Sequence, residues 1–530
     1  MQVVLGQAPA DILLRGASVL NVFTGEVLRT NVALVGERIA GVGDYHEGHE
    51  VVDLTGRFLI PGLIDAYLHL ESSMMTPPAF ARAALPHGTT TVIADAQEIV
   101  NAIGLIGLEY MLEAGQSLPL DIYYLISRDY PEIYQKNPAV LSKMVTAQEV
   151  SKRMDREASF LNEKYFQALA AAGVRTDHEC TYPREAEEKL ELGVHILIRE
   201  GSSSKNLDQL LNMVNTTTYP FCSFCSDDRL PQDLIAEGEM DHILRYAVAW
   251  GLDPVTAVRM ATLNPARLYG LQDRGAIAPG YLADLVVVDS IYAYRVQQVY
   301  KRGVKVVDKG KVTVPPIKDK LASSLRASVT RTVHLTGLDD KLNFTPPVGA
   351  ERARVIDVLG DQLVTRMGWV SVGAIDPEYD VMKVAVIERG GKRGSVGLGF
   401  VRGFGLKTGA LASTVAHEDH NLIVVGAEKE AMLLAAETVA QMGGGLAVVS
   451  ANKVLATLPL PVAGLMSEES AEKIALKYAE VNAAAQGLGC TIYAPFMTMS
   501  FLTQPSIPAL KITEQGLVEV NQNKVVDLWE

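Results

Sequence analysis

Pro61-Gly-Leu-Ile-Asp-Ala-Tyr-Leu-His-Leu-Glu-Ser-Ser73 runs from an apolar strand into a series of ionisable side chains. Tyr67, His69 and Glu71 recur with a period of two, so they project from one face if the strand continues through them. Neutral imidazole and carboxylate together suit a divalent cation, which lowers the pKa of bound water and so generates hydroxide. The segment therefore predicts one wall of a metal-dependent site.

Two further clusters come directly after apolar strands, Thr176-Asp-His-Glu179 and Ser226-Asp-Asp-Arg229. An α/β barrel places its active site at such strand ends. Taken singly, a histidine at a strand end is more often structural, and Asp-Asp-Arg is more often a helix cap with an ion pair. Three clusters in the same context raise the catalytic interpretation to about equal weight with the structural one.

The chain around these clusters alternates short apolar strands with longer helical stretches, which is typical of parallel βα units. The expected strands are Phe58–Ile64, Thr90–Ala94, Asp121–Ile126, Val174–Thr176, Val194–Ile198 and Tyr219–Cys225. Short β patterns with turns fill the first sixty residues, and Tyr300–Val314 continues them. We therefore expect an α/β protein in three parts: a composite β-sandwich domain (1–57 with 275–315), a (β/α) barrel domain (58–274) and an α+β domain (330–530).

Composition excludes several functional classes. The 530 residues carry 48 Lys and Arg against 62 Asp and Glu, a net charge of −14. This acidic balance argues against nucleic acid or an anionic membrane as the main partner. With no signal peptide and no apolar run of about 18 residues, we expect a soluble, cytoplasmic protein. Four cysteines are too few for a disulfide framework, and Cys222 and Cys225 lie on opposite faces of an expected strand.

A larger set of motifs makes the sequence recognisable. They are Pro61-Gly-Leu-Ile-Asp-Ala66, His69-Leu-Glu-Ser-Ser73, His87-Gly-Thr-Thr-Thr-Val-Ile-Ala-Asp95, Thr176-Asp-His-Glu179, Ile198-Arg-Glu-Gly-Ser202, Asp227-Asp-Arg229, Met260-Ala-Thr-Leu-Asn-Pro-Ala266, Gly275-Ala-Ile-Ala-Pro-Gly-Tyr-Leu-Ala-Asp284, Gly403-Phe-Gly-Leu-Lys407, Val415-Ala-His-Glu-Asp-His-Asn421 and Pro495-Phe-Met-Thr498. With these motifs, the chain resembles the adenine deaminases of the amidohydrolase superfamily from about Asp11 to its C-terminus. The resemblance implies an amidohydrolase-type barrel and hydrolysis of adenine at C6, which gives hypoxanthine and ammonia.

The resemblance also implies a metal-binding set. His69 corresponds to the second histidine of a His-x-His pair on the first barrel strand, and His178 to the ligand on the sixth strand. Asp227 corresponds to the carboxylate of the eighth strand, which binds metal and shuttles a proton. Glu179, beside His178, is a further catalytic candidate.

Four other residues match functional positions of the family pattern. Glu98 is a candidate for proton transfer, and Glu71, Asp228 and Arg229 are candidates for substrate binding. The implied ligand is a purine base, and the implied assembly is a homo-oligomer, which could include an active paralogue.

The chain departs from the family pattern at positions that are expected to take part in the chemistry. Tyr67 takes the place of the first histidine of His-x-His, and a phenol with a pKa near 10 is a poor substitute for imidazole. Gln97 and Ala96 replace the His and Pro of a Pro-His-Glu segment, and Leu230 and Glu239 replace two further histidines. The expected ligands shrink to His69, His178 and Asp227, which suit a single Mn, Fe or Zn ion.

The interval between strands one and six is also short. Only 109 residues separate His69 from His178, which leaves about 22 for each of five βα units where roughly 30 are typical. Nothing strand-like is evident from Pro131 to Gly173, and both 139–156 and 160–172 have a helical pattern. We therefore expect a barrel that lacks about two strands, the fourth and the fifth.

Alternatives to an active deaminase remain open at this stage. The lost histidines also fit an inactive paralogue that acts as a regulatory or structural subunit, or a nucleobase-binding protein without turnover. In the last domain, His417-Glu-Asp-His420 has the spacing of a metal motif, but a turn or an interface is the favoured interpretation because a strand follows it.

Overall fold

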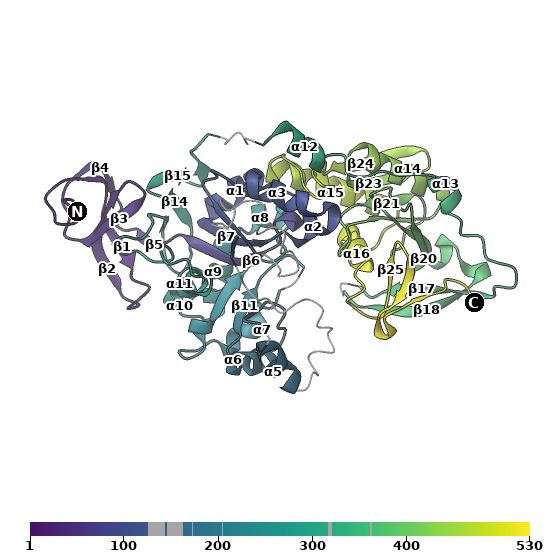
Figure 1. Cartoon of the computed structure of the whole chain (residues 1–530), viewed down its shortest axis with the longest axis horizontal. Helices are drawn as coiled ribbons and strands as arrows, with labels where there is room; N and C mark the ends of the chain where they lie inside the picture. Colours follow the sequence, from purple (N-terminus) through teal and green to yellow (C-terminus); the bar gives the residue numbers. More distant parts are fainter. Residues whose placement is uncertain (126–143, 146–162, 172, 204, 316–320, 361–362) are drawn as a thin grey trace. The chain divides into compact units, whose positions relative to one another are not determined.

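The computed structural model describes residues 1–125, 144–145, 163–171, 173–203, 205–315, 321–360 and 363–530 (Figure 1). These residues divide into two compact units. The first consists of Met1–Ser73, Pro77–Asp95 and Ala114–Asp319, and the second of Met74–Thr76, Ala96–Glu113 and Lys320–Glu530. Within the described residues, no helix is both long and apolar enough to cross a membrane.

Parallel strands form the centre of the first unit. They are β6 (Leu63–Leu68), β7 (Thr89–Asp95), β8 (Asp121–Leu125), β9 (Met144–Val145), β10 (Thr176–Asp177), β11 (His195–Arg199) and β12 (Cys222–Cys225). The orders β6-β7-β8-β9 and β10-β11-β12 are hydrogen-bonded in parallel. The two groups meet where the amide of His69 donates to the carbonyl of Asp227 at 2.8 Å and the amide of Asp227 donates to the carbonyl of Tyr67 at 3.1 Å. This arrangement confirms the parallel βα pattern expected from the sequence.

Several expected boundaries were wrong. The apolar run 58–64 is split between β5 (Phe58–Pro61), which belongs to another sheet, and β6. The run 219–225 begins as a 3₁₀ turn, η6 (Tyr219–Phe221), because Pro220 has no amide hydrogen to donate to a strand ladder.

The interval 131–173 contains a strand where we expected only helix. Met144–Val145 forms β9 and pairs with β8 in parallel, so the barrel has a fourth strand in sequence order. The expected helix 160–172 is confirmed as α5 (Glu163–Ala171). We expected most of the missing barrel sequence in this interval. Its residues 126–143 and 146–162 lie outside the described residues.

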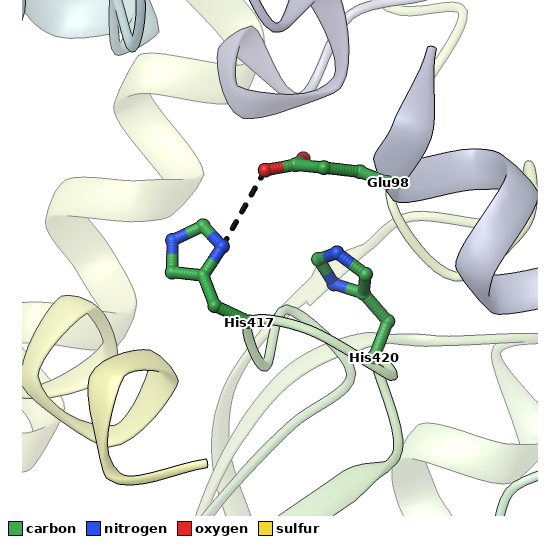
Figure 2. A group of neighbouring side chains, drawn as sticks. All are labelled: Glu98, His417 and His420. Carbon is green, nitrogen blue, oxygen red and sulfur yellow. Dashed lines mark ion pairs between the residues drawn. The ribbon is translucent and has the colours of Figure 1, made fainter. Parts of the chain in front are cut away.

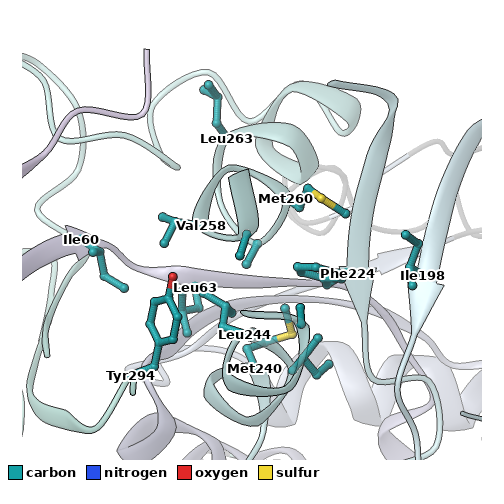
Figure 3. Close-up of a cluster of buried hydrophobic side chains, with 14 of the residues drawn as sticks. Ile60, Leu63, Ile198, Phe224, Met240, Leu244, Val258, Met260, Leu263 and Tyr294 are labelled. Atoms are coloured by element: carbon teal, nitrogen blue, oxygen red, sulfur yellow. The ribbon is translucent and has the colours of Figure 1, made fainter. Parts of the chain in front are cut away.

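Helices of the first unit cover the strands. They are α1 (Pro77–Ala84), α5, α6 (Pro183–Glu191), α7 (Leu207–Leu210), α8 (Pro231–Ala236), α9 (Met240–Ala249), α10 (Pro254–Met260) and α11 (Leu263–Leu268), with 3₁₀ turns η1 (Leu70–Ser73), η2 (Leu85–His87), η5 (Leu211–Met213) and η6. Proline at the first helical position starts α6, α8 and α10, where an amide hydrogen is not needed. Apolar side chains of α9 and α10, including Leu244 and Val258, pack with Phe224 of β12 in a buried core (Figure 3).

A second sheet in the first unit joins both ends of the barrel sequence. Its strands are β1 (Ala10–Leu20), β2 (Val27–Val35), β3 (Arg38–Gly43), β4 (Gly48–Asp53), β5, β13 (Leu285–Val288), β14 (Val296–Lys301), β15 (Val304–Asp308) and β16 (Lys311–Val312). β5 lies between β1 and β13, so strands from before and after the barrel share one sheet. The three domain boundaries expected from the sequence stay a prediction.

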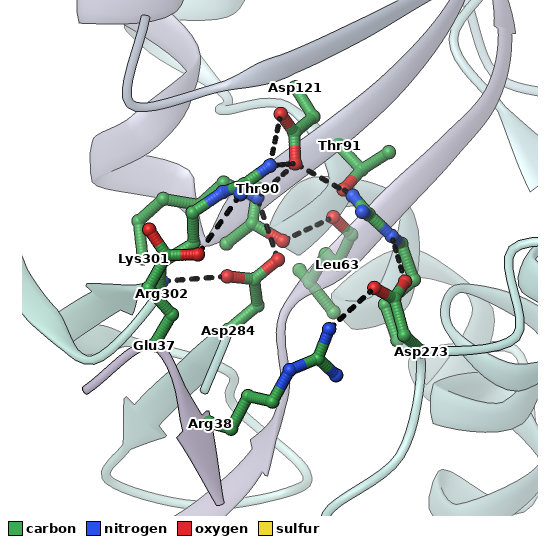
Figure 4. A network of polar contacts seen from close by, with 11 residues as sticks. Glu37, Arg38, Leu63, Thr90, Thr91, Asp121, Asp273, Asp284, Lys301 and Arg302 are labelled. Atoms are coloured by element: carbon green, nitrogen blue, oxygen red, sulfur yellow. Dashed lines mark hydrogen bonds and ion pairs between the residues drawn. The ribbon is translucent and has the colours of Figure 1, made fainter. Parts of the chain in front are cut away.

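Buried charges connect this sheet to the barrel (Figure 4). Asp121, the first residue of β8, accepts hydrogen bonds from Arg274 at 2.7 Å and from Lys301 of β14 at 2.9 Å. Lys301 also donates to Asp284 at 2.6 Å. Burial alone would raise the pKa of Asp121, but the charges of Lys301 and Arg274 outweigh it and hold that pKa well below its ordinary value. The network is thus a structural ion cluster.

The second unit is built on an antiparallel-rich sheet. Its strands, in spatial order, are β18 (Thr365–Ser371), β17 (Arg352–Val358), β20 (Val396–Arg402), β19 (Val381–Ile387), β22 (Leu422–Gly426), β21 (Ala410–Ser413), β23 (Gly445–Ser450) and β24 (Lys453–Pro459). A small sheet contains β25 (Leu510–Thr513), β26 (Gly516–Glu519) and β27 (Lys524–Val526).

Helices of the second unit come from two parts of the chain. They are α2 (Gln97–Ile103), α3 (Leu105–Ala114, whose last residue falls in the first unit), α12 (Ser323–Val329), α13 (Leu338–Lys341), α14 (Lys429–Gln441), α15 (Ala471–Gly487) and α16 (Pro495–Leu502), with 3₁₀ turns η7 (Val372–Ala374), η8 (Pro377–Tyr379) and η9 (Val520–Gln522). α14 buries Met432, Ala435 and Val439, a spacing that places one apolar face against the sheet.

Candidate active site

The predicted barrel residues lie at the carboxyl ends of three strands. Tyr67 is near the end of β6 and His69 follows that strand, while His178 follows β10 and Asp227 follows β12. All four side chains are buried. Asp227 has a positive φ of 57°, an uncommon conformation for a residue other than glycine that turns the chain sharply at the strand end.

A hydrogen-bonded series connects Tyr67 to two of its neighbours. The Tyr67 hydroxyl donates to Oδ2 of Asp95 at 3.2 Å and lies 3.0 Å from Nε2 of His69. A hydroxyl carries one hydrogen, so when it donates to Asp95 its oxygen is left to accept from Nε2–H of His69.

A second series runs through Arg199. Its guanidinium pairs with Oδ2 of Asp227 at 3.0 Å and with Oε2 of Glu179 at 3.0 Å. Burial alone would lower the pKa of Arg199, but the charges of Glu179 and Asp227 outweigh it and raise that pKa above its ordinary value. Glu179 also lies 3.3 Å from Nε2 of His178. A permanent cation therefore lies between two of the predicted catalytic carboxylates.

Two of the three predicted metal ligands, His69 and Asp227, approach each other. Nε2 of His69 and Oδ1 of Asp227 are 3.9 Å apart, and two ligands with bonds of about 2.1 Å to one ion lie at most about 4.2 Å apart. The ring of His178 stacks on Tyr67 with centroids 4.0 Å apart. Across the described residues, the ligand atoms of His69, His178 and Asp227 do not all lie within 4.8 Å of one another. His69 and Asp227 thus fit a divalent cation, and His178 does not reach the same point.

Asp228 and Arg229, which follow Asp227, make hydrogen bonds and an ion pair to neighbouring loops. Asp228 accepts hydrogen bonds from the amides of Ser202 and Ser203, both at 3.1 Å. Burial and the neighbouring charge of Asp227 raise the pKa of Asp228 above its ordinary value. Arg229 pairs with Glu237 at 2.7 Å. These contacts are structural, and substrate binding by Asp228 and Arg229 stays a prediction.

Glu71 and Glu98 occupy different units. Glu71 is buried in η1, directly after the His69 segment of the first unit. Glu98 lies in α2 of the second unit, where its Oε1 is 3.4 Å from Nδ1 of His417. The assignment of Glu98 to proton transfer in the barrel therefore stays a prediction, and its observed neighbour, His417, is a residue for which we favoured a turn or an interface.

Glu239, which we expected in place of a family histidine, is buried. It accepts a hydrogen bond from Thr89 and caps α9 through the amide of Met240. Burial, followed by the nearby charge of Asp65, raises the pKa of Glu239 well above its ordinary value. Asp65 in turn accepts from the amide of Ser226 at 3.1 Å. This carboxyl pair joins β6 to the end of β12.

Sequence reasoning assigned no role to Arg199 or Asp95. Both stand inside motifs that were noted for the resemblance, and both are at or near the end of a barrel strand. Strand-end position was therefore the available signal. Their partners, Asp227 and Tyr67, are 28 residues away in each case.

Comparison with known proteins defines the class and then the family. Residues 58–160 and 132–321 match the amidohydrolase family model, and residues 362–524 match the adenine deaminase C-terminal domain. The adenine deaminase of Kosmotoga olearia is 40% identical over 567 residues, covering 99% of this chain and 97% of its own length. That of Desulfatibacillum aliphaticivorans is 41% identical over 566 residues, covering 99% and 98%. The chain therefore belongs to the adenine deaminase family.

Both alignments contain more positions than this chain has residues, so these relatives carry segments that the chain lacks. This agrees with the expected shortening, although it does not locate it. Among solved structures, β-aspartyl dipeptidase from Fervidobacterium islandicum is 15% identical with a TM-score of 0.45, over 59% of this chain and all of that one.

Proposed function

We propose that the protein deaminates adenine hydrolytically: water adds at C6, the C6–N bond breaks, and hypoxanthine and ammonia are released. The observation that carries the proposal is the identity of about 40% to adenine deaminases over nearly the whole of both chains. The match includes the adenine deaminase C-terminal domain as well as the amidohydrolase region.

Asp227 is the proposed proton-transfer group. Arg199 holds Oδ2, while Oδ1 faces Nε2 of His69. In this orientation Asp227 takes one proton from the attacking water and passes it to the departing amine, while the second water proton ends on N1 of hypoxanthine, so that no net proton is gained or lost. General acid–base transfer of this kind contributes about 10²–10⁴-fold to a rate.

His69 and Asp227 are the proposed ligands of one divalent cation, Mn, Fe or Zn. Such a cation supplies hydroxide from water near neutral pH. Asp95 accepts a hydrogen bond from the Tyr67 hydroxyl beside His69, and Arg199 orients Asp227 and Glu179. The ring of His178 stacks on Tyr67.

The direct test measures adenine loss and hypoxanthine by chromatography, with ammonia as a second product, on protein reconstituted with Mn²⁺. We expect Asp227→Asn to lower kcat by at least about 100-fold. The matched control is Asp44→Asn, which makes the same change at an aspartate whose side chain is 91% exposed. This control should keep the kcat of the unsubstituted protein.

Two results would contradict the proposal. One is hypoxanthine formation that is equal in the unsubstituted protein and in Asp227→Asn. The other is adenine binding by calorimetry without turnover, which would assign the chain to nucleobase binding.

A further inference from the structure

A cluster of two imidazoles and one carboxylate lies in the second unit, apart from the barrel residues. Glu98 of α2 and the loop residues His417 and His420 point toward one another (Figure 2). Each offers a ligand atom within 4.8 Å of those of the other two. Among the described residues, this is the one group of three His, Cys, Asp or Glu side chains that meets this criterion.

We propose that Glu98, His417 and His420 bind a divalent transition-metal ion of the Zn²⁺ class. Two imidazoles and one carboxylate form a common zinc donor set. Nδ1 of His417 and Oε1 of Glu98 are 3.4 Å apart, close to the separation of two tetrahedral ligands with bonds of about 2.1 Å. This site shares no ligand with His69 and Asp227.

The backbone around His417 is fixed. Its amide donates to the carbonyl of Ser500 at 3.0 Å, and its carbonyl accepts from Oγ1 of Thr503 at 2.8 Å. Its ring lies against Phe501, with centroids 4.9 Å apart. These contacts hold the imidazole in place before an ion arrives, so little ordering is needed for binding.

His420 is held as firmly and is only 1% exposed. Its amide donates to the carbonyl of Ala416 at 2.8 Å, and its own carbonyl accepts from Arg389 at 3.0 Å. The amide of Ala416 approaches Nδ1 of His420 at a long 3.4 Å. If the ion binds Nδ1 of His420, it replaces this weak contact. If the ion binds Nε2, the imidazole proton moves to Nδ1.

Glu98 brings a distant part of the chain to the loop. In the same helix, the side-chain amide of Asn101 donates to the carbonyl of Glu418 at 2.9 Å, across 317 positions of sequence. A cation bound by Glu98 and the two histidines would therefore cross-link α2 to the loop between β21 and β22. Such an ion stabilises the folded unit, because the unfolded chain does not hold these ligands together.

The test measures Zn²⁺ binding on the full-length chelated protein by calorimetry, bound zinc by elemental analysis, and the rise in Tm on adding Zn²⁺. We expect Glu98→Gln and His417→Gln each to remove one equivalent of Zn²⁺, with a Kd at least about 100-fold weaker. Both variants should also lose the corresponding rise in Tm. Asp227→Asn should retain this equivalent, as should His46→Gln, a control at an exposed histidine.

Unchanged zinc stoichiometry and affinity in His417→Gln would overturn the proposal. Loss of every equivalent in Asp227→Asn would overturn it as well, since it would place all the zinc in the barrel. The side chain of His417 is 21% exposed, so this variant carries the test even if the buried Glu98→Gln variant does not fold. Co²⁺ absorption in the visible range, with a band that His417→Gln abolishes, gives the same answer without calorimetry.

Discussion

Tyr67→Phe should tighten binding of Zn²⁺ to the barrel site. The hydroxyl now lies 3.0 Å from Nε2 of His69, the nitrogen that faces Asp227. A cation that uses this nitrogen must displace the hydroxyl. Phenylalanine keeps the ring that stacks on His178 and removes only the competing group.

The magnitude follows from the hydrogen bond that the cation no longer has to displace. A typical intramolecular hydrogen bond contributes about 0.5–1.5 kcal/mol net, which corresponds to a Kd that is about 2–12-fold lower. The variant should also be less stable without metal by about 1–3 kcal/mol, because Asp95 and His69 lose a buried partner.

Calorimetric titration of chelated protein with Zn²⁺ measures the effect, and His417→Gln in both proteins removes the other proposed site. Urea unfolding without metal gives the stability change. If Tyr67→Phe leaves the Kd unchanged or weakens it, the hydroxyl is not a competitor of the cation. The reasoning would then fail, and Tyr67 would be either a metal ligand or a residue without effect on metal binding.

Three further predictions concern stability. Asp121→Asn should cost about 1.5–3 kcal/mol in urea unfolding, because Arg274 and Lys301 lose a shared buried carboxylate while Lys301 keeps Asp284; a loss smaller than about 1 kcal/mol would contradict this. Burial lowers the pKa of His195 from 6.5 to about 4, so the unfolded state alone takes up a proton between these values. Stability should therefore fall by about 3 kcal/mol as pH drops from about 6.5 to 4, and His195→Gln should flatten this part of the pH profile. Phe224→Ala should cost about 3–5 kcal/mol in the buried core, against little for the exposed Phe221→Ala; equal losses would contradict the packing.

Local pattern was sufficient for part of the fold. The apolar runs at 90–94 and 194–198 are β-branched and bounded by turns or charges, and both became parallel strands of the barrel. The 58–64 run was misplaced because periodicity does not say which of two sheets a strand joins, and hydrogen bonding to β1 and β13 decides that for β5.

The candidate site, like the fold, could be predicted from the sequence only in part. Strand ends and motifs identified His69, His178, Asp227 and Glu179 as residues of one region, and they do lie in one connected set of contacts around Tyr67 and Arg199. Which atoms face one another could not be read from the chain. The relation of Asp95 to Tyr67 and of Arg199 to Asp227 depends on neighbouring strands whose order is a tertiary property.

The amino-acid sequence by itself determined the residue types, the periodicity of each strand and the family motifs, because these are local or inherited features of the chain. The tertiary structure alone decided that His178 stacks on Tyr67 instead of meeting His69, and that Glu98 meets His417. Both outcomes depend on side-chain distances between segments far apart in sequence, which only packing sets.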